Sequence, residues 1–455
     1  MSAIIKNVRY DERAFEYRLI RDAIAGERAV KAQGQLYTKK ADGITTANYE
    51  HYLERGCFYG APEMTLRALV GLALRKDPVV TLPKRLEPMR LNATHEKAPL
   101  SVLIEDTVRE VMALGRYGLL LEFPREGNGA LTTPYFSTWR AEEITDWNTA
   151  YVNGRKELTR VVLASDEKFD GADVFIECVL EDTIYKQKRF IVDTDRDRVD
   201  VGDEIIPTVG GKHLDHIPMV IVSHESLRPE DVKPPFLDLC TLAISHFRNS
   251  CDREHAIYLT AAPTPVVTGN IAEDKVPTTI GAGAMWVLPE GATAQYLEFQ
   301  GGGVGSQKDL MAEKVDMMAT LGARMLSVTM NRNETIDTAT QRTRSELALL
   351  HSVVVMVEAA LNRQLRLAAQ WLAADPDEAR VTMSRDFIET AMDPKMVEVQ
   401  MKAWQSGAIS RATLYENLQA GEIARADRSL EDERDLIEEE GGDLSDSILR
   451  FPTEA

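Results

Sequence analysis

The stretch PPFLDLCTLAISHFRNSCDREHAIYL, Pro234 to Leu259, decides the fold of this chain. Two prolines stand just before its start, where a missing backbone N–H costs a helix nothing. Apolar residues then recur every three or four positions, at Phe236, Leu239, Cys240, Ala243 and Phe247. This spacing predicts a helix that buries one face.

A short β-like insert follows this helix. The segment APTPVVTG, residues 262–269, contains two prolines that prevent the helix from continuing. The runs AMWVLP (284–289) and AQYLEF (294–299) have the composition of strands and are separated by the turn residues Glu290 and Gly291. We therefore expect a small β module here, with these two runs as its strands.

A second helix is predicted from Ser306. Glycines 301–303 end the insert and indicate a flexible joint, and one stripe of the helix then carries Met311, Val315, Met318, Gly322 and Met325. Each of the two helices has a little over twenty residues and so a length of about 33 Å. Matched lengths predict an antiparallel pair that carries the β module at its tip.

A polar loop and a third helix complete this central part of the chain. The loop SVTMNRNETIDTATQ, residues 327–341, is rich in Thr and Asn. The run RSELALLHSVVVMVEAALNRQLRLAAQWLAA, residues 344–374, is apolar around most of its circumference. We expect this helix to be buried between neighbouring elements.

This succession of elements resembles the stem, clip, stem, tunnel loop and long internal helix of the portal proteins of tailed bacteriophages, also called head–tail connectors. Four further stretches resemble the shorter portal proteins, in the same order: Tyr49–Pro83, Leu114–Pro124, Ser384–Phe387 and Trp404–Glu422. None of these motifs is a catalytic signature. Their order along the chain carries the resemblance.

The resemblance implies an α+β, portal-like fold with a helical stem, a β-containing clip, an α/β wing and a helical crown. The implied parts are a wing (1–233, β-rich from about 115), a first stem helix (234–260), a clip (261–304), a second stem helix (305–328), a tunnel loop (329–341), a long internal helix (342–374), a return to the wing (375–392), a crown (393–426) and an acidic tail (427–455).

The function that the resemblance implies is structural and involves no catalysis and no cofactor or metal. Portal proteins form a ring, usually of twelve subunits, at one vertex of the virion capsid, after assembly in the host cytoplasm. Double-stranded DNA passes through the ring. The implied partners are the terminase large subunit, the head–tail adaptor, and the major capsid and scaffold proteins.

Two groups of residues take roles from the resemblance. Asn331, Arg332, Asn333 and Thr335 of the tunnel loop would face DNA. Trp286, Tyr296 and Phe299 of the clip would contact terminase and the adaptor, because aromatic residues often dominate interfaces. Burial of these three rings within the clip itself is an equally good interpretation. The methionine stripe likewise fits either core packing or contact with a neighbouring subunit.

Composition agrees with a large folded protein that is not a generic nucleic-acid binder. The chain has 455 residues, 44% of them hydrophobic, and a formal net charge of −19. Nucleic-acid binders usually carry a basic face, whereas an acidic channel wall repels DNA and leaves it mobile. We find no apolar run long enough for a signal peptide or a membrane span and expect a cytosolic protein without membrane contact.

The segments before and after the central part of the chain have different predicted secondary structure. Residues 1 to about 110 have helical patterns, and residues 115 to about 222 contain short β-like runs with DG, NG and GG turns between them. Helices are again predicted at 394–406 and at 410–420, the latter with Ser410 as its N-cap. The acidic segment 427–446 fits a solvated or disordered charged end.

Several residue groups that suggest chemistry are better explained structurally. GGGVGSQK, residues 301–308, lacks the Lys-Ser/Thr pair of a phosphate-binding loop. His213, His216 and His224 have no further metal ligands at a consistent spacing. Asp238, His246, Asp252 and His255 lie on the first long helix without a nucleophile, so we expect solvated or subunit-facing side chains. The four cysteines are far apart and are expected to be reduced.

Two other classes of function stay open. An enzyme that acts on nucleic acids would need a cluster of metal-binding carboxylates or a phosphate loop, and the sequence shows neither. Another virion structural protein, such as a minor capsid protein or an adaptor, would equally lack catalytic residues. Adaptors are usually much shorter than this chain, and the order of stem, insert and stem favours a portal protein.

Overall fold

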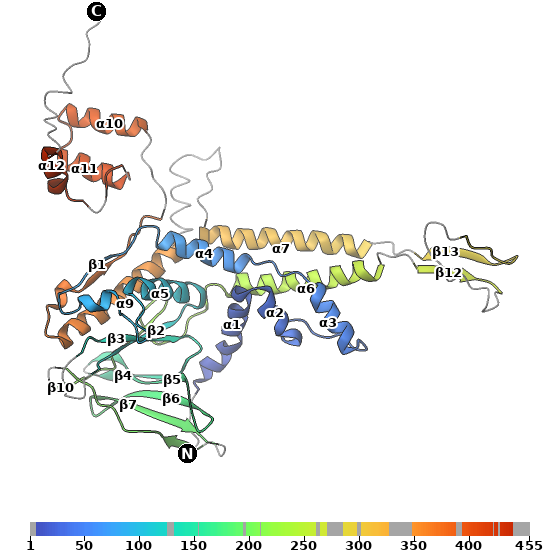
Figure 1. The fold of residues 1–455 in the computed structure, drawn as a ribbon, viewed down its shortest axis with the longest axis horizontal. Helices are drawn as coiled ribbons and strands as arrows, with labels where there is room; N and C mark the ends of the chain where they lie inside the picture. The colour runs from blue at the N-terminus through green and yellow to red at the C-terminus, as the bar shows by residue number, and fades with distance from the viewer. Residues whose placement is uncertain are drawn as a thin grey trace, which may run out of the picture. The chain divides into compact units, whose positions relative to one another are not determined.

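The computed structural model describes residues 6–124, 132–152, 154–193, 197–209, 211–260, 264–270, 285–297, 302–326, 348–387, 394–421, 423–425 and 428–439. The chain divides into two compact units, Met1–Arg385 and Asp386–Ala455 (Figure 1). Helices and antiparallel strands are segregated along the chain, so the fold is α+β, as predicted from the sequence.

Helices begin the first unit. They are α1 (Val8–Ala25), α2 (Glu27–Ala32), α3 (Thr46–Arg55), α4 (Ala61–Ala73) and α5 (Leu100–Leu114), with 3-10 turns at Gly34–Leu36 and Glu87–Arg90. Side-chain caps explain two of the starts, because Asn7 and Thr45 accept bonds from backbone N–H groups of the first turn. Gly115 ends α5 in the left-handed conformation, φ 71°.

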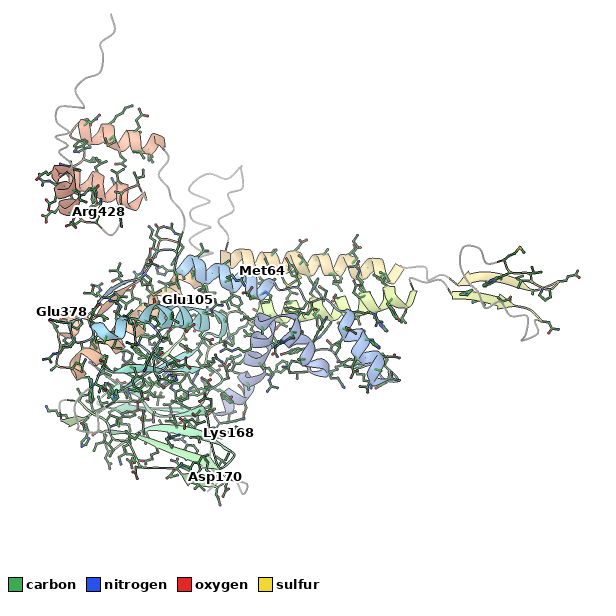
Figure 2. All side chains as sticks on the ribbon, in the orientation of Figure 1. Met64, Glu105, Lys168, Asp170, Glu378 and Arg428 are labelled. Carbon is green, nitrogen blue, oxygen red and sulfur yellow. The ribbon has the colours of Figure 1, made fainter. Side chains whose placement is uncertain are left out.

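Two antiparallel sheets follow. A three-stranded sheet has the order β11-β2-β3, and a five-stranded sheet has the order β4-β5-β6-β7-β8. Their strands are β2 (Tyr117–Glu122), β3 (Tyr135–Arg140), β4 (Ile144–Val152), β5 (Arg155–Phe169), β6 (Ala172–Glu181), β7 (Ile184–Val192), β8 (Arg198–Asp200) and β11 (Met219–Val222). The predicted DG turn joins β5 to β6 at Asp170 and Gly171 (Figure 2), both with positive φ.

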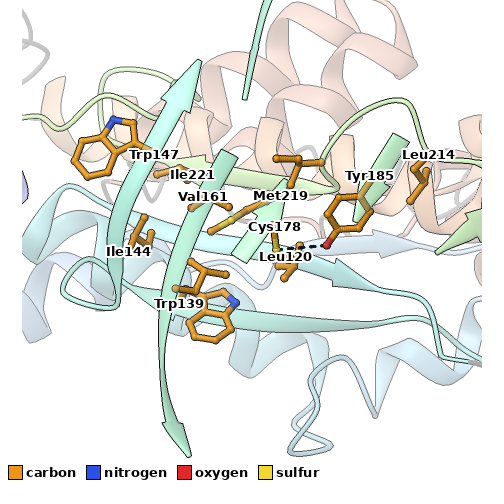
Figure 3. Close-up of a cluster of buried hydrophobic side chains, with 12 residues drawn as sticks. Leu120, Trp139, Ile144, Trp147, Val161, Cys178, Tyr185, Leu214, Met219 and Ile221 are labelled. Atoms are coloured by element: carbon orange, nitrogen blue, oxygen red, sulfur yellow. Dashed lines mark hydrogen bonds between the residues drawn. The ribbon is translucent and has the colours of Figure 1, made fainter. Parts of the chain in front are cut away.

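A shared apolar core lies between these two sheets (Figure 3). Leu120 and Trp139 come from the small sheet, and Trp147, Val161 and Tyr185 come from the large one. Tyr185 donates a hydrogen bond to Cys178 over 3.5 Å, and burial raises the pKa of both groups above its usual value. The β-rich run that the sequence predicts is therefore one packed body.

Helix α9 (Ala348–Trp371) covers this body from the helical side. Its apolar positions are buried against α5 and β11, as the sequence predicts. Gln364 donates to the backbone oxygens of Leu119 and Pro218, at 3.0 and 3.1 Å. Asn362 donates to the Val381 oxygen and accepts from the Val381 N–H. These bonds fix α9 to β2, to β14 and to Pro218, the residue just before β11.

Three minor strand pairs complete the β structure of the described residues. β14 (Arg380–Thr382) pairs with β1 (Val79–Thr81), and β9 (Thr208–Val209) pairs with β10 (Lys212–His213). A third pair, described below, lies between the two longest helices. The strand-like run expected near residue 380 thus returns to the first unit, where its partner comes from 300 residues earlier.

The second unit is helical. It contains α10 (Pro394–Gln405), α11 (Arg411–Ala420) and α12 (Leu430–Glu439). Ser410 caps α11 by accepting from the Thr413 N–H, as predicted. Of the two alternatives for the acidic end, solvated or disordered, residues 430–439 form a helix with mostly exposed side chains, and the Ser429 hydroxyl caps it by accepting from the Asp432 N–H. Residues 440–455 lie outside the described residues.

Candidate functional site

The first of the two long helices, α6 (Leu237–Thr260), is anchored in the first unit along one face. The predicted apolar positions Leu239, Cys240, Ala243 and Phe247 are all buried, and α1, α3, α4 and α7 pack against the helix. Gly56 lies against it so closely that an added Cβ would stand 2.2 Å from the Cys251 sulfur. The helix is thus part of the core of the unit.

The polar residues of α6 do not all face solvent, which corrects the expectation for this group. His246 is buried and its ring lies 6.0 Å from that of Tyr59. Asp252 accepts a 2.6 Å bond from the Tyr52 hydroxyl, and His255 packs edge-on against the Tyr52 ring. These contacts within the chain join α3 to α6.

Asp238 and Asp252 match the expectation of solvated side chains, and Asp238 has no partner on another helix among the described residues. It is exposed and accepts bonds from the ammonium of Lys233 at 2.7 and 2.8 Å. An ion pair between exposed side chains contributes little to stability. Asp238 is therefore available to a partner.

The second long helix, α7 (Gly302–Leu326), runs antiparallel to α6 (Figure 1). It begins at Gly302, so the expectation of a flexible joint through residues 301–303 is wrong from that residue on. The two helices have 24 and 25 residues and lie side by side, as predicted from their matched patterns. We call α6 and α7 the stem helices.

Lys314 joins the two stem helices through its ammonium group. It donates to the hydroxyl of Ser245 over 2.8 Å, to the Ser245 carbonyl over 3.3 Å, and to the side-chain oxygen of Asn249. Burial and the charge of Arg248 both lower the pKa of Lys314. The three acceptors are neutral, so Lys314 joins the two helices through directional hydrogen bonds and not through an ion pair.

A strand hairpin connects the stem helices. β12 (Thr264–Thr268) pairs with β13 (Thr293–Leu297), with Val266 opposite Gln295. Of the two predicted strands, the second is confirmed as β13, and the first is wrong because Met285–Pro289 lies outside the ladder. The strand that pairs with β13 is β12, which follows the first stem helix. β-Branched Val266, Val267 and Thr268 explain that strand, since such side chains favour extended backbone.

The predicted clip residues have different positions in the structure. Trp286 is half-buried and lies outside the strand ladder, between exposed Met285 and Val287. Tyr296 lies in β13, opposite Pro265, and nothing is described of its side chain. Phe299 lies outside the described residues, as do Asn331, Arg332, Asn333 and Thr335 of the expected tunnel loop. The interface role of all seven residues stays a prediction.

A groove of about 700 Å³ runs along the outer side of the stem helices. Its floor contains Leu242, Met317 and Leu321, and acidic Asp238, Glu313 and Asp316 stand around it. Leu310 lies seven positions before Met317 and so on the same side of α7. We call these residues the groove face. The sequence analysis missed it, because only the pairing of the two helices brings it together.

The other residue groups that suggest chemistry do not assemble a site. Within the described part of the chain, no group of three or more His, Cys, Asp and Glu side chains could hold a metal ion. His213 and His216 are on a turn and a short strand, and Cys178, Cys240 and Cys251 are buried free thiols. Of the methionine stripe, Met318 is buried and Met311 half-buried, and nothing is described of the Met325 side chain.

The first unit has the order of elements that the sequence predicts. A stem helix, a strand hairpin, a second stem helix and a long internal helix follow one another, and a β-rich body precedes them. The predicted α+β architecture and order of elements are therefore confirmed. None of the described helices is long and apolar enough to cross a membrane.

Comparisons with known proteins find likenesses over most of the chain. A family model described as "Domain of unknown function (DUF4055)" matches residues 235–372, from the start of α6 to the end of α9. The chain is similar to a chain in the virion of a native gene transfer agent particle, with 13% identity, a TM-score of 0.42, and 87% of this chain and 98% of that chain covered.

Two neck structures of such particles are also similar to this chain. The neck of the native particle, computed with C12 symmetry, gives 11% identity, a TM-score of 0.42 and coverages of 85% and 98%. The neck of the empty particle, computed with C6 symmetry, gives 12% identity, a TM-score of 0.40 and coverages of 88% and 99%. None of the curated proteins matches the chain.

Proposed function

We propose that this protein is a portal protein: a noncatalytic virion component that forms a ring at one capsid vertex, through which double-stranded DNA enters and leaves. One observation carries the proposal. Two antiparallel helices of matched length stand on an α/β body and are joined by a strand hairpin. A ring of such stems forms a channel wall, and the hairpins form one rim of the ring.

The charge of the chain fits a channel that lets DNA move. The net charge of the chain is −19. Basic walls would bind phosphates and release counterions, which would hold DNA in place. Acidic walls repel phosphates and leave the duplex mobile.

The proposed partners are those that the resemblance to portal proteins implies. The clip, residues 261–304, would dock the terminase large subunit during packaging and a head–tail adaptor afterwards. Its hairpin leaves both outer strand edges without a partner among the described residues, and such edges accept further strands. The body would contact the major capsid and scaffold proteins, and residues 329–341 would face DNA.

Electron microscopy of the purified full-length chain, with its mass measured in solution, tests the proposal. We expect rings with a central hole and a mass of about twelve chains. The matched variant lacks residues 263–300. It should still form rings but lose binding to terminase and adaptor. Full-length protein that stays monomeric at all concentrations would contradict the proposal, and loss of rings in the deletion variant would contradict a separate clip.

A further inference from the structure

The groove face presents large apolar side chains to solvent. Leu310 is 41% exposed and Met317 is 50% exposed, although both lie on a helix that packs against the rest of the unit. Leu242 of α6 and Leu321 of α7 extend the apolar floor between them. Contiguous apolar surface of this kind marks a site of interaction.

The opposite side of α7 has small residues in place of large ones. Ala312 and Ala319 are exposed, and each lies two positions after Leu310 or Met317. Two positions correspond to about 200° around a helix, so the alanines face away from the groove. The large and the small side chains therefore lie on opposite sides of the same helix.

Helix α4 extends this small surface. It packs on α7, where Thr65 lies close to Gly322, and exposes Ala68 and Gly71, with exposed Met64 one turn before Ala68. Lys308 of α7 and Arg67 of α4 are also exposed, and the Arg67 guanidinium is paired with Glu63 at 2.6 Å. We call Ala68, Gly71, Ala312 and Ala319, with Arg67 and Lys308, the small-residue face.

The two faces are complementary in shape and in charge. Protruding Leu310 and Met317 fit a surface of alanine and glycine, on which another helix can approach closely. The carboxylate of Glu313 on the groove face matches the cation Lys308 on the other face, which favours this pairing over two groove faces meeting. Contacts between different surfaces on opposite sides of one subunit are head-to-tail, and such contacts close into rings.

We propose that the groove face receives the small-residue face of a second copy of this chain. The inference rests on the proposed function and names the surfaces by which neighbouring stems would meet. In a ring of parallel stems, residues at the same position along the stem axis lie side by side in neighbouring copies. Lys308 and Glu313 are only about 7.5 Å apart along the helix, so Lys308 of one copy would lie near Glu313 of the next.

A charge exchange tests the pairing in the full-length chain. Glu313→Lys and Lys308→Glu should each raise the concentration at which half of the chains are in rings by about tenfold. The variant with both substitutions restores opposite charges at every interface and should assemble nearly as the wild type does. Asp166→Lys, an exposed carboxylate on β5, is the control and should leave assembly unchanged.

A steric substitution tests the same interface by an independent route. Ala319→Trp fills the small-residue face and should prevent ring formation while leaving the thermal unfolding of the monomer unchanged, because Ala319 is exposed. Rings that form equally well in all these variants would overturn the interface but not the portal assignment. A wild-type chain that never forms rings would overturn both.

Discussion

Stem helices α6 and α7 have nearly equal length and lie side by side, yet they are held in very different ways. α6 buries Leu239, Ala243, Phe247 and Cys251, and it packs against α1, α3 and α4 as well as α7. On α7, Met318 is the only large apolar side chain that is fully buried among those described. Length and periodicity therefore do not show which helix is core and which is surface.

The largest difference is expected from truncation of one buried and one exposed apolar residue. Phe247→Ala removes a fully buried ring that packs against Phe58 and should lower the free energy of unfolding by about 3–5 kcal/mol. Met317→Ala removes a half-exposed side chain and should cost less than about 1 kcal/mol. Denaturant unfolding of both variants under monomeric conditions measures the contrast, and equal losses would show that α7 is core as well.

A smaller difference in stability is expected between alanine substitutions of two glycines, Gly56, which packs against α6, and Gly322, which lies in α7. In Gly56→Ala the new Cβ would meet the Cys251 sulfur and the Phe247 ring at 2.2 and 3.0 Å, which should cost about 1–3 kcal/mol. In Gly322→Ala the nearest atom is the Thr65 hydroxyl at 3.1 Å, and alanine favours the helix by about 1 kcal/mol. Gly322→Ala should therefore be nearly neutral. A strongly destabilised Gly322→Ala variant would mean that α4 and α7 cannot separate slightly.

The smallest effect is a pH dependence that arises where the two helices meet. Burial, and then the charge of Lys314, lower the pKa of His246. The unfolded chain, in which the pKa is about 6.5, then binds the proton more tightly than the folded chain. The contribution of neutral His246 to the free energy of unfolding is complete above about pH 6.5 and decreases as the pH falls below that value. The free energy of unfolding should fall less between pH 7.5 and 5.5 in His246→Gln than in the wild type, and equal slopes would refute this role for His246.

Local patterns predicted much of the helical part. The cap of α11 at Ser410 and the buried face of α6 follow from cap residues and apolar spacing, which depend on residues close together in the chain. The turn at Glu290 and Gly291 is present too, with φ 83° at the glycine. These features need no knowledge of distant segments.

Long-range pairing is what local patterns could not supply. Both AMWVLP and TPVVT have strand-like composition, and only the ladder with β13 shows that the second is the hairpin strand. The partner of β14 stands 300 positions earlier in β1. The groove face depends on which sides of α6 and α7 meet, and this is set by Lys314 with Ser245 and Asn249.

The fixation of α9 by Asn362 and Gln364 has a mechanical consequence. Both amides hold the helix to strand backbones near its C-terminal half. Ala348, its first residue, lies fourteen positions from Asn362, which corresponds to about 21 Å along a helix. Leu350 and Val353 near that end are also buried, and Ser352 donates to the His224 carbonyl, so a sideways force at Ala348 passes into the body along the whole helix and not through the two amides alone.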